Sequence, residues 1–169
     1  MGFNLIEYFY PKEIILVDFD FGNDTFTNRF QKYIENDRGY FSDEFFSTEK
    51  TYLGKIDSTE FILRKKRKFM NPNMSPANAN GKIFGDKDRT NIKIELNGND
   101  EFNGFGKIFA HLFFLIIFIT IIINEAYPLL IIFIPFSIAF LAFIHFTQVK
   151  KMKEFKENLM NILNQLRDE

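Results

Sequence analysis

The sequence predicts a mixed α+β protein, with a small cytoplasmic antiparallel sheet and one helix, a two-helix transmembrane hairpin and a C-terminal amphipathic helix. The run from Ile108 to Phe146 is almost entirely apolar, segments before it alternate apolar and polar side chains, and the segment after it repeats apolar residues in steps of three and four. We therefore expect a cytoplasmic domain at 1–97, a tether at 98–107, the hairpin at 108–146 and a cytoplasmic helix at 148–169.

The first predicted strand covers residues 13–21, which begin as an apolar, β-branched run and end by alternating aspartate with phenylalanine. A turn at Gly22-Asn23-Asp24 follows it. Apolar side chains then recur at helical spacing, so residues 25–36 are expected to form a helix with Asp24 or Thr25 as its N-cap.

Two hairpins are expected to complete the sheet. Residues 51–56 and 60–69 flank the turn Asp57-Ser58-Thr59, and residues 81–84 and 90–96 flank a second turn that begins at Gly85. Strict alternation in the last of these strands predicts one buried face and one wet face. Residues 71–80 are expected to form a polar loop.

The apolar run is interrupted once, between residues 123 and 126, so it predicts helices at 108–123 and 126–146. Lysines flank the open end of this hairpin, whereas its turn carries Glu125 and no basic residue. The positive-inside bias then places both termini in the cytoplasm of an inner membrane. Pro135 is expected to kink the second helix.

The C-terminal helix carries a narrow apolar seam of coiled-coil type. This seam either joins two copies of the chain or packs against the chain's own sheet, and we weigh the two equally. Its contact residues are Met152, Phe155, Leu159, Ile162 and Leu166.

Several segments in order resemble a family of small bacterial two-span membrane proteins that have no assigned activity. They are Phe61–Arg64, Phe69–Asn71 with Pro76, Gly81–Ile83, Thr90–Ile94 and the apolar hairpin that follows. The resemblance implies a strand pair, an Asn/Pro loop, a Gly-rich hairpin and two spans, and it implies nothing about chemistry.

Basic residues at two places are candidates for contact with anionic lipid headgroups, where each contributes about 1 kcal/mol near the surface. A solvated strand end is the alternative for the first group. Nucleic acid is not expected, because the formal net charge is −1 and the rest of the predicted domain is acidic. The candidates are Arg64, Lys65, Lys66, Arg67, Lys68, Lys150, Lys151 and Lys153.

Asp18 and Asp20 follow an apolar strand in an Asp-x-Asp pattern. This resembles the first motif of haloacid-dehalogenase-type phosphatases, where the first carboxylate attacks phosphorus and the second handles protons beside magnesium. Phe21-Gly22 stands where that motif continues with Gly-Thr. A strand with a solvated acidic face is the favoured interpretation.

His111 and His145 are the two histidines, and both fall within the predicted spans. Counting from the turn, they differ in depth by roughly 9 Å, which is too far for one metal ion. We therefore expect them near the cytoplasmic headgroups. No cysteine is present, so cysteine-ligated metal is excluded, and no metal site or cofactor is expected.

These observations favour a non-enzymatic membrane-anchored interaction or regulatory module at the inner leaflet. Its expected partners are membrane lipid and a protein, or a second copy bound through the terminal helix. The alternatives are a membrane-bound Asp-x-Asp phosphatase-like enzyme and a subunit of a small membrane transporter or channel assembly.

Overall fold

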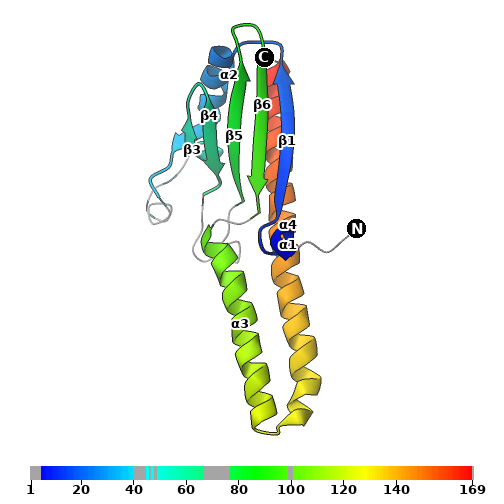
Figure 1. Ribbon diagram of the computed structural model, residues 1–169. Coiled ribbons are helices and arrows are strands. Elements are labelled where there is room, and N and C mark those ends of the chain that lie inside the picture. Colours follow the sequence, from blue (N-terminus) through cyan, green and yellow to red (C-terminus); the bar gives the residue numbers. More distant parts are fainter. Residues whose placement is uncertain are drawn as a thin grey trace.

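The structure, a computed structural model, describes residues 5–39, 45, 47, 49–66, 77–98 and 101–168, without side-chain detail for residues 5, 6 and 101–105. A twisted sheet lies beside one half of a long helix, and the other half of that helix forms a hairpin with a second helix (Figure 1). The elements are α1 (Leu5–Phe9), β1 (Lys12–Phe19), α2 (Asn23–Phe30), η1 (Gln31–Tyr33), β2 (Ile34–Asn36), β3 (Tyr52–Ile56), β4 (Glu60–Arg64), β5 (Asn78–Gly85), β6 (Thr90–Asn97), α3 (Glu101–Ile123), η3 (Tyr127–Leu129) and α4 (Leu130–Asp168).

The strands form one sheet in the order β1-β6-β5-β4-β3-β2. Both predicted hairpins are present, as the antiparallel pairs β3–β4 and β5–β6. The α+β class is confirmed, but the sheet has six strands and is not small. The strand predicted for 13–21 is β1, which pairs along its whole length with β6, and β2, which was not predicted, adds a parallel edge to the expected antiparallel sheet.

The helix predicted for residues 25–36 is too long. It ends at Phe30, one 3₁₀ turn follows, and Ile34 takes extended backbone angles and pairs with Tyr52. Ile34 is buried. Sheet pairing of a β-branched residue therefore overrides the helical spacing of the sequence.

The boundaries of two strands differ from those predicted. The strand predicted for 60–69 ends at Arg64, and residues 67–69 lie outside the described part of the chain. Strand β5 begins at Asn78, so it takes in the end of the predicted 71–80 loop. Residues 71–76, which carry the Asn/Pro element of the family resemblance, lie outside the described residues.

The second span and the C-terminal helix are not separate elements. They form one 39-residue helix, α4, which continues through Pro135 and past Phe146. The sequence after the span contains no Pro or Gly, so nothing there ends the helix. At the other side of the hairpin, helix α3 begins at Glu101, so most of the predicted tether is helical.

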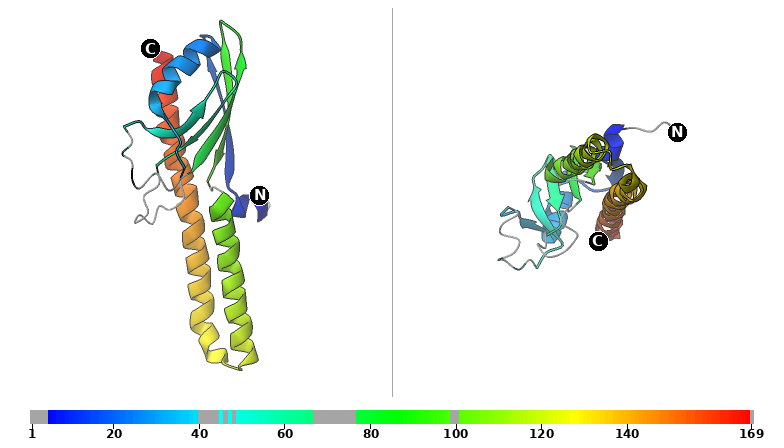
Figure 2. Two further views of the ribbon diagram at one scale, coloured as in Figure 1. Left: turned by 90° about the vertical axis from the view of Figure 1, so that its left-hand side faces the viewer. Right: turned by 90° about the horizontal axis from the view of Figure 1, so that it is seen from below.

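The core lies between the sheet and the upper half of α4, with α2 covering the far end of the same sheet face (Figure 2). Phenylalanine rings from strand and helix meet there, with ring centroids 5.3 Å apart for Phe19 and Phe26 and 5.2 Å apart for Phe30 and Phe61. The Phe61 ring lies over Gly81, its partner across the strands, where a Cβ atom would come within 2.1 Å of the ring.

The lower halves of α3 and α4 pack on each other through Phe114, whose ring lies 5.6 Å from Phe140 and 5.9 Å from Phe133. Most of their other side chains point outward, and Ile131 is 77% exposed. Both helices are long and apolar enough to cross a membrane, and at most 11% of either apolar window is buried. Among the described residues, no other part of the chain covers these surfaces, unlike those of the core helix of a soluble domain. The Ser137 hydroxyl donates to the backbone carbonyl of Phe133 in its own helix.

Candidate functional site at the junction of sheet and hairpin

Lys107 is buried where the sheet meets the hairpin, with only 1% of its surface exposed. Its ammonium donates to the backbone carbonyl of Tyr8 and to the Gln148 side chain at 3.1 Å, and it lies 3.2 Å from Nδ1 of His145. It also lies 3.8 Å from the centre of the Tyr8 ring, within cation–π range. Within the described ranges its partners are thus neutral acceptors from α1 and α4.

Both histidines flank Tyr8. The His145 ring stacks on the tyrosine ring with centroids 4.9 Å apart, and Nε2 of His111 lies 3.4 Å from the tyrosine hydroxyl. Nδ1 of His111 lies 2.7 Å from the carbonyl of Lys107 in its own helix. His145 contacts Lys107, and His111 lies four residues, about 6 Å, further along α3. Burial raises the pKa of Tyr8.

This arrangement, which we name the junction cluster, comprises Tyr8, Lys107, His111, His145 and Gln148. It brings three elements together: α1, the start of α3 and the middle of α4. No group of three or more potential metal-ligating side chains occurs within the described residues. The cluster can fasten the elements to one another, because each lysine hydrogen bond crosses from one element to another.

Arg64 does not belong with the exposed basic residues. It is 5% exposed, and its guanidinium donates two hydrogen bonds of 2.6 Å to the two carboxylate oxygens of Asp37. Arg64 follows Leu63, which belongs to the core, so along β4 it lies on the other face of the sheet, where it pairs with Asp37. These hydrogen bonds lower the pKa of Asp37. Arg64 is therefore not a headgroup contact, and its prediction is corrected.

Lys65 and Lys66 follow directly and are partly buried. They lie at the end of the sheet nearest the helical hairpin, because Arg64 pairs with Asn78, which pairs with Asn97 just before α3. Burial lowers the pKa of Lys65. Arg67 and Lys68 lie outside the described residues.

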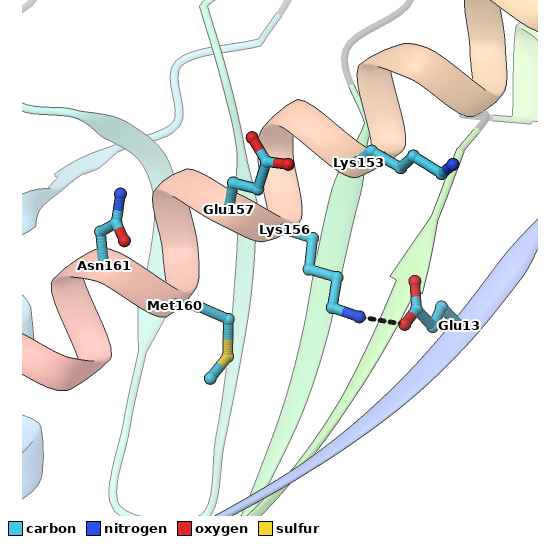
Figure 3. Close-up of a pocket in the computed structure, with 6 residues that line it drawn as sticks. All are labelled: Glu13, Lys153, Lys156, Glu157, Met160 and Asn161. Atoms are coloured by element: carbon cyan, nitrogen blue, oxygen red, sulfur yellow. Dashed lines mark hydrogen bonds and ion pairs between the residues drawn. The ribbon is translucent and has the colours of Figure 1, made fainter.

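The α4 lysines sit just above the hairpin. Lys150 has a 78% exposed side chain and lies 3.9 Å from Glu154, whereas Lys151 is partly buried. Lys153 is exposed and lines an open groove of about 470 Å³ between α4 and β1. Lys156 crosses this groove to pair with Glu13 (Figure 3).

The apolar seam of α4 lies against the sheet, which is the second of the two arrangements considered. Its five residues are 8% exposed or less, and the Phe155 ring lies 5.3 Å from that of Tyr52. Leu163 is buried as well, so the seam is wider than the sequence pattern suggested. A second copy cannot use these side chains while they cover the sheet.

Asp18 and Asp20 are both exposed and stand at the end of the edge strand β1. A haloacid-dehalogenase-type site requires a doubly wound parallel sheet, whereas β1 has one antiparallel neighbour. The backbone carbonyl of Asp18 accepts a hydrogen bond of 2.9 Å from Arg167. The structure adds no support for a phosphatase site.

Sequence reasoning missed Tyr8 and Gln148. Gln148 follows the second apolar run, and Lys107 precedes the first. In an antiparallel hairpin these two positions lie at the same level, so the sequence could have predicted that the two polar side chains meet. Nothing in the sequence places α1 beside the hairpin.

No family model matches the chain, and no curated protein or solved structure matches it.

Proposed function

We propose that the protein is a non-enzymatic integral protein of the inner membrane that presents its sheet as an interaction or regulatory module at the inner leaflet. One observation carries this proposal. The same α4 helix exposes apolar side chains along its lower half and fills the sheet core with its upper half. An anchor and a folded domain that share a helix cannot move independently.

The proposed orientation has both termini in the cytoplasm. The turn between α3 and η3 carries Glu125 and no basic residue, while lysines gather at the opposite end of the hairpin. Lys65, Lys66 and Lys150 lie at that end and are placed to contact anionic headgroups. Membership of the family of small two-span bacterial proteins stays a prediction.

The anchoring is tested with the full chain carrying a reporter at either end. We expect the chain to resist alkaline extraction from membranes and both reporters to be cytoplasmic. A chain released without detergent, or a reporter found outside the cell, would overturn the proposal.

The interaction role is tested by cross-linking and mass spectrometry in native membranes. We expect a reproducible partner or a defined oligomer. A strictly monomeric detergent particle with no reproducible cross-link, or phosphoesterase activity that is lost in Asp18→Asn, would contradict a non-enzymatic module.

A further inference from the structure

The contacts of the junction cluster fix the charge state of His145. The Lys107 ammonium has three hydrogens to donate. Its acceptors are the carbonyl of Tyr8, the side-chain oxygen of Gln148 at 3.1 Å and Nδ1 of His145 at 3.2 Å. Because an ammonium donates and cannot accept, Nδ1 of His145 carries no proton in this arrangement. The His145 ring is therefore neutral, with its one N–H proton on Nε2.

The second histidine of the cluster is not restricted in this way. Nδ1 of His111 lies 2.7 Å from the backbone carbonyl of Lys107, and a carbonyl only accepts, so this nitrogen carries a proton. Nε2 of His111 lies 3.4 Å from the Tyr8 hydroxyl, which can donate to a neutral ring or accept from a protonated one. His111 thus fits the cluster in both charge states, whereas His145 fits it only as a neutral ring.

The groups around His145 do not compensate a second positive charge. The facing group from α3 is the Lys107 ammonium, and those from its own helix are Phe146 and Gln148, both neutral. From α1, the ring and carbonyl of Tyr8 face His145, but Lys107 already lies 3.8 Å from the ring centre and donates to the carbonyl. Within the described ranges, no ion pair joins His145 to a carboxylate. A proton on Nδ1 would therefore place two repelling cations side by side.

We propose that the junction cluster is a pH-sensitive switch, in which protonation of His145 separates it from Lys107 and releases α1 from the hairpin. Tyr8 is released as well, because its ring stacks on His145 and its carbonyl binds the same ammonium. An exposed imidazole takes up a proton as pH falls below about 6.5. The released state then binds more protons than the fastened one, so release grows as pH falls below this value and is absent above it. This inference goes beyond the proposed interaction role and rests on the contacts of the cluster.

The test uses the full chain in nanodiscs with one nitroxide label at Glu7→Cys, an exposed position of α1 in a sequence that has no cysteine of its own. We expect the ratio of mobile to immobile label to rise about 30-fold from pH 8 to pH 5, as for a group that binds a proton near pH 6.5 only when released. The same label at Lys82→Cys, an exposed position of β5, should not change, which excludes general unfolding. Mobility at Glu7→Cys that does not depend on pH would overturn the inference.

Two matched variants of the labelled chain separate the roles of the histidines. His145→Asn keeps a side-chain oxygen that can accept from Lys107 but cannot take up a proton, so the pH response should be lost. His111→Asn removes the other imidazole, and the response should remain. A response that survives in His145→Asn, or one that is lost in His111→Asn, would overturn the inference.

Nitrogen NMR of the histidine rings provides a second measurement on the unlabelled wild-type chain, which has two histidines. At the higher pH we expect the proton of His145 on Nε2 and that of His111 on Nδ1. A proton on Nδ1 of His145 would overturn the inference. Retention in nanodiscs is measured separately, so a retained chain without a pH response rejects the switch and not the membrane anchoring.

Discussion

The ammonium of Lys107 lies 3.2 Å from Nδ1 of His145, and this contact joins the first turns of α3 to the middle of α4. The same ammonium reaches Gln148, one helical turn further along α4. The hairpin is thus closed at both ends, by its short turn on one side and by this lysine on the other. Tyr8 covers the lysine and ties α1 to the closed end.

Lys107→Met tests the fastening role. The variant keeps an unbranched side chain of similar length but leaves buried acceptors without a donor, which costs about 1–3 kcal/mol. We expect a matching fall in the free energy of unfolding in detergent and faster proteolysis near α1. Lys150→Met, at an exposed position on α4, is the control and should change little. A Lys107→Met protein as stable as Lys150→Met would show that the cluster does not hold the elements together.

The Asp37–Arg64 pair makes stability depend on pH. The pKa of Asp37 is lower in the folded chain than in the unfolded chain, chiefly because of the hydrogen bonds from Arg64. Its stabilisation is therefore complete above the unfolded value of about 3.9 and is lost as pH falls through the folded value. We expect Asp37→Asn to lower the urea midpoint at neutral pH, with a difference from wild type that shrinks below about pH 4. Arg64→Met should have the same pH profile, and a difference that stays constant down to acid pH would contradict the assignment.

Leu159→Ala tests the packing of α4 on the sheet. Leu159 is 0% exposed, and truncation of a buried leucine costs about 2–5 kcal/mol. The control Ile132→Ala removes a side chain that is 74% exposed on the hairpin, so sheet stability should not change. Both variants should retain the oligomeric state of the wild type. Dissociation of an oligomer by Leu159→Ala, with stability of the monomer unchanged, would instead favour a seam between copies.

Hydrogen exchange tests which amides of β1 face its neighbour β6. Strand β1 ends the described sheet, and Gly98 donates to the carbonyl of Pro11, so the odd-numbered residues of β1 face β6. In the unliganded chain, the amides of Ile15 and Val17 should exchange slowly, because they pair with Ile94 and Ile92 of β6. Those of Ile14 and Leu16 should exchange faster by orders of magnitude, since they face away from the sheet. NMR of the labelled protein resolves this alternation, and uniform protection along the strand would mean that another segment covers the edge.

The local patterns of the sequence predicted the hairpins and the two apolar helices. The turns around Asp57 and Asp86 are held by those aspartates, which accept backbone hydrogen bonds of 2.8 to 3.1 Å, and such turns are encoded within a few residues. The apolar helices follow from composition alone.

Long-range pairings were not predictable in the same way. The switch of Ile34 from helix to strand depends on Tyr52, and the burial of Arg64 depends on Asp37. Each partner lies many positions away along the chain. The cluster of basic residues suggested that Arg64 is exposed, whereas Arg64 is buried. A charge pattern in the sequence does not reveal which carboxylate will lie beside a given arginine.

The continuous helix α4 couples the tilt of the span to the position of the sheet. At 1.5 Å per residue its 39 residues span about 58 Å, so a change of about 10° in the tilt of the span displaces the far end of the helix by about 10 Å. Bilayers of different thickness change helix tilt. Lipid composition would then set how far the outer strands stand from the leaflet, which distance measurements between spin labels on the sheet and lipid headgroups can follow.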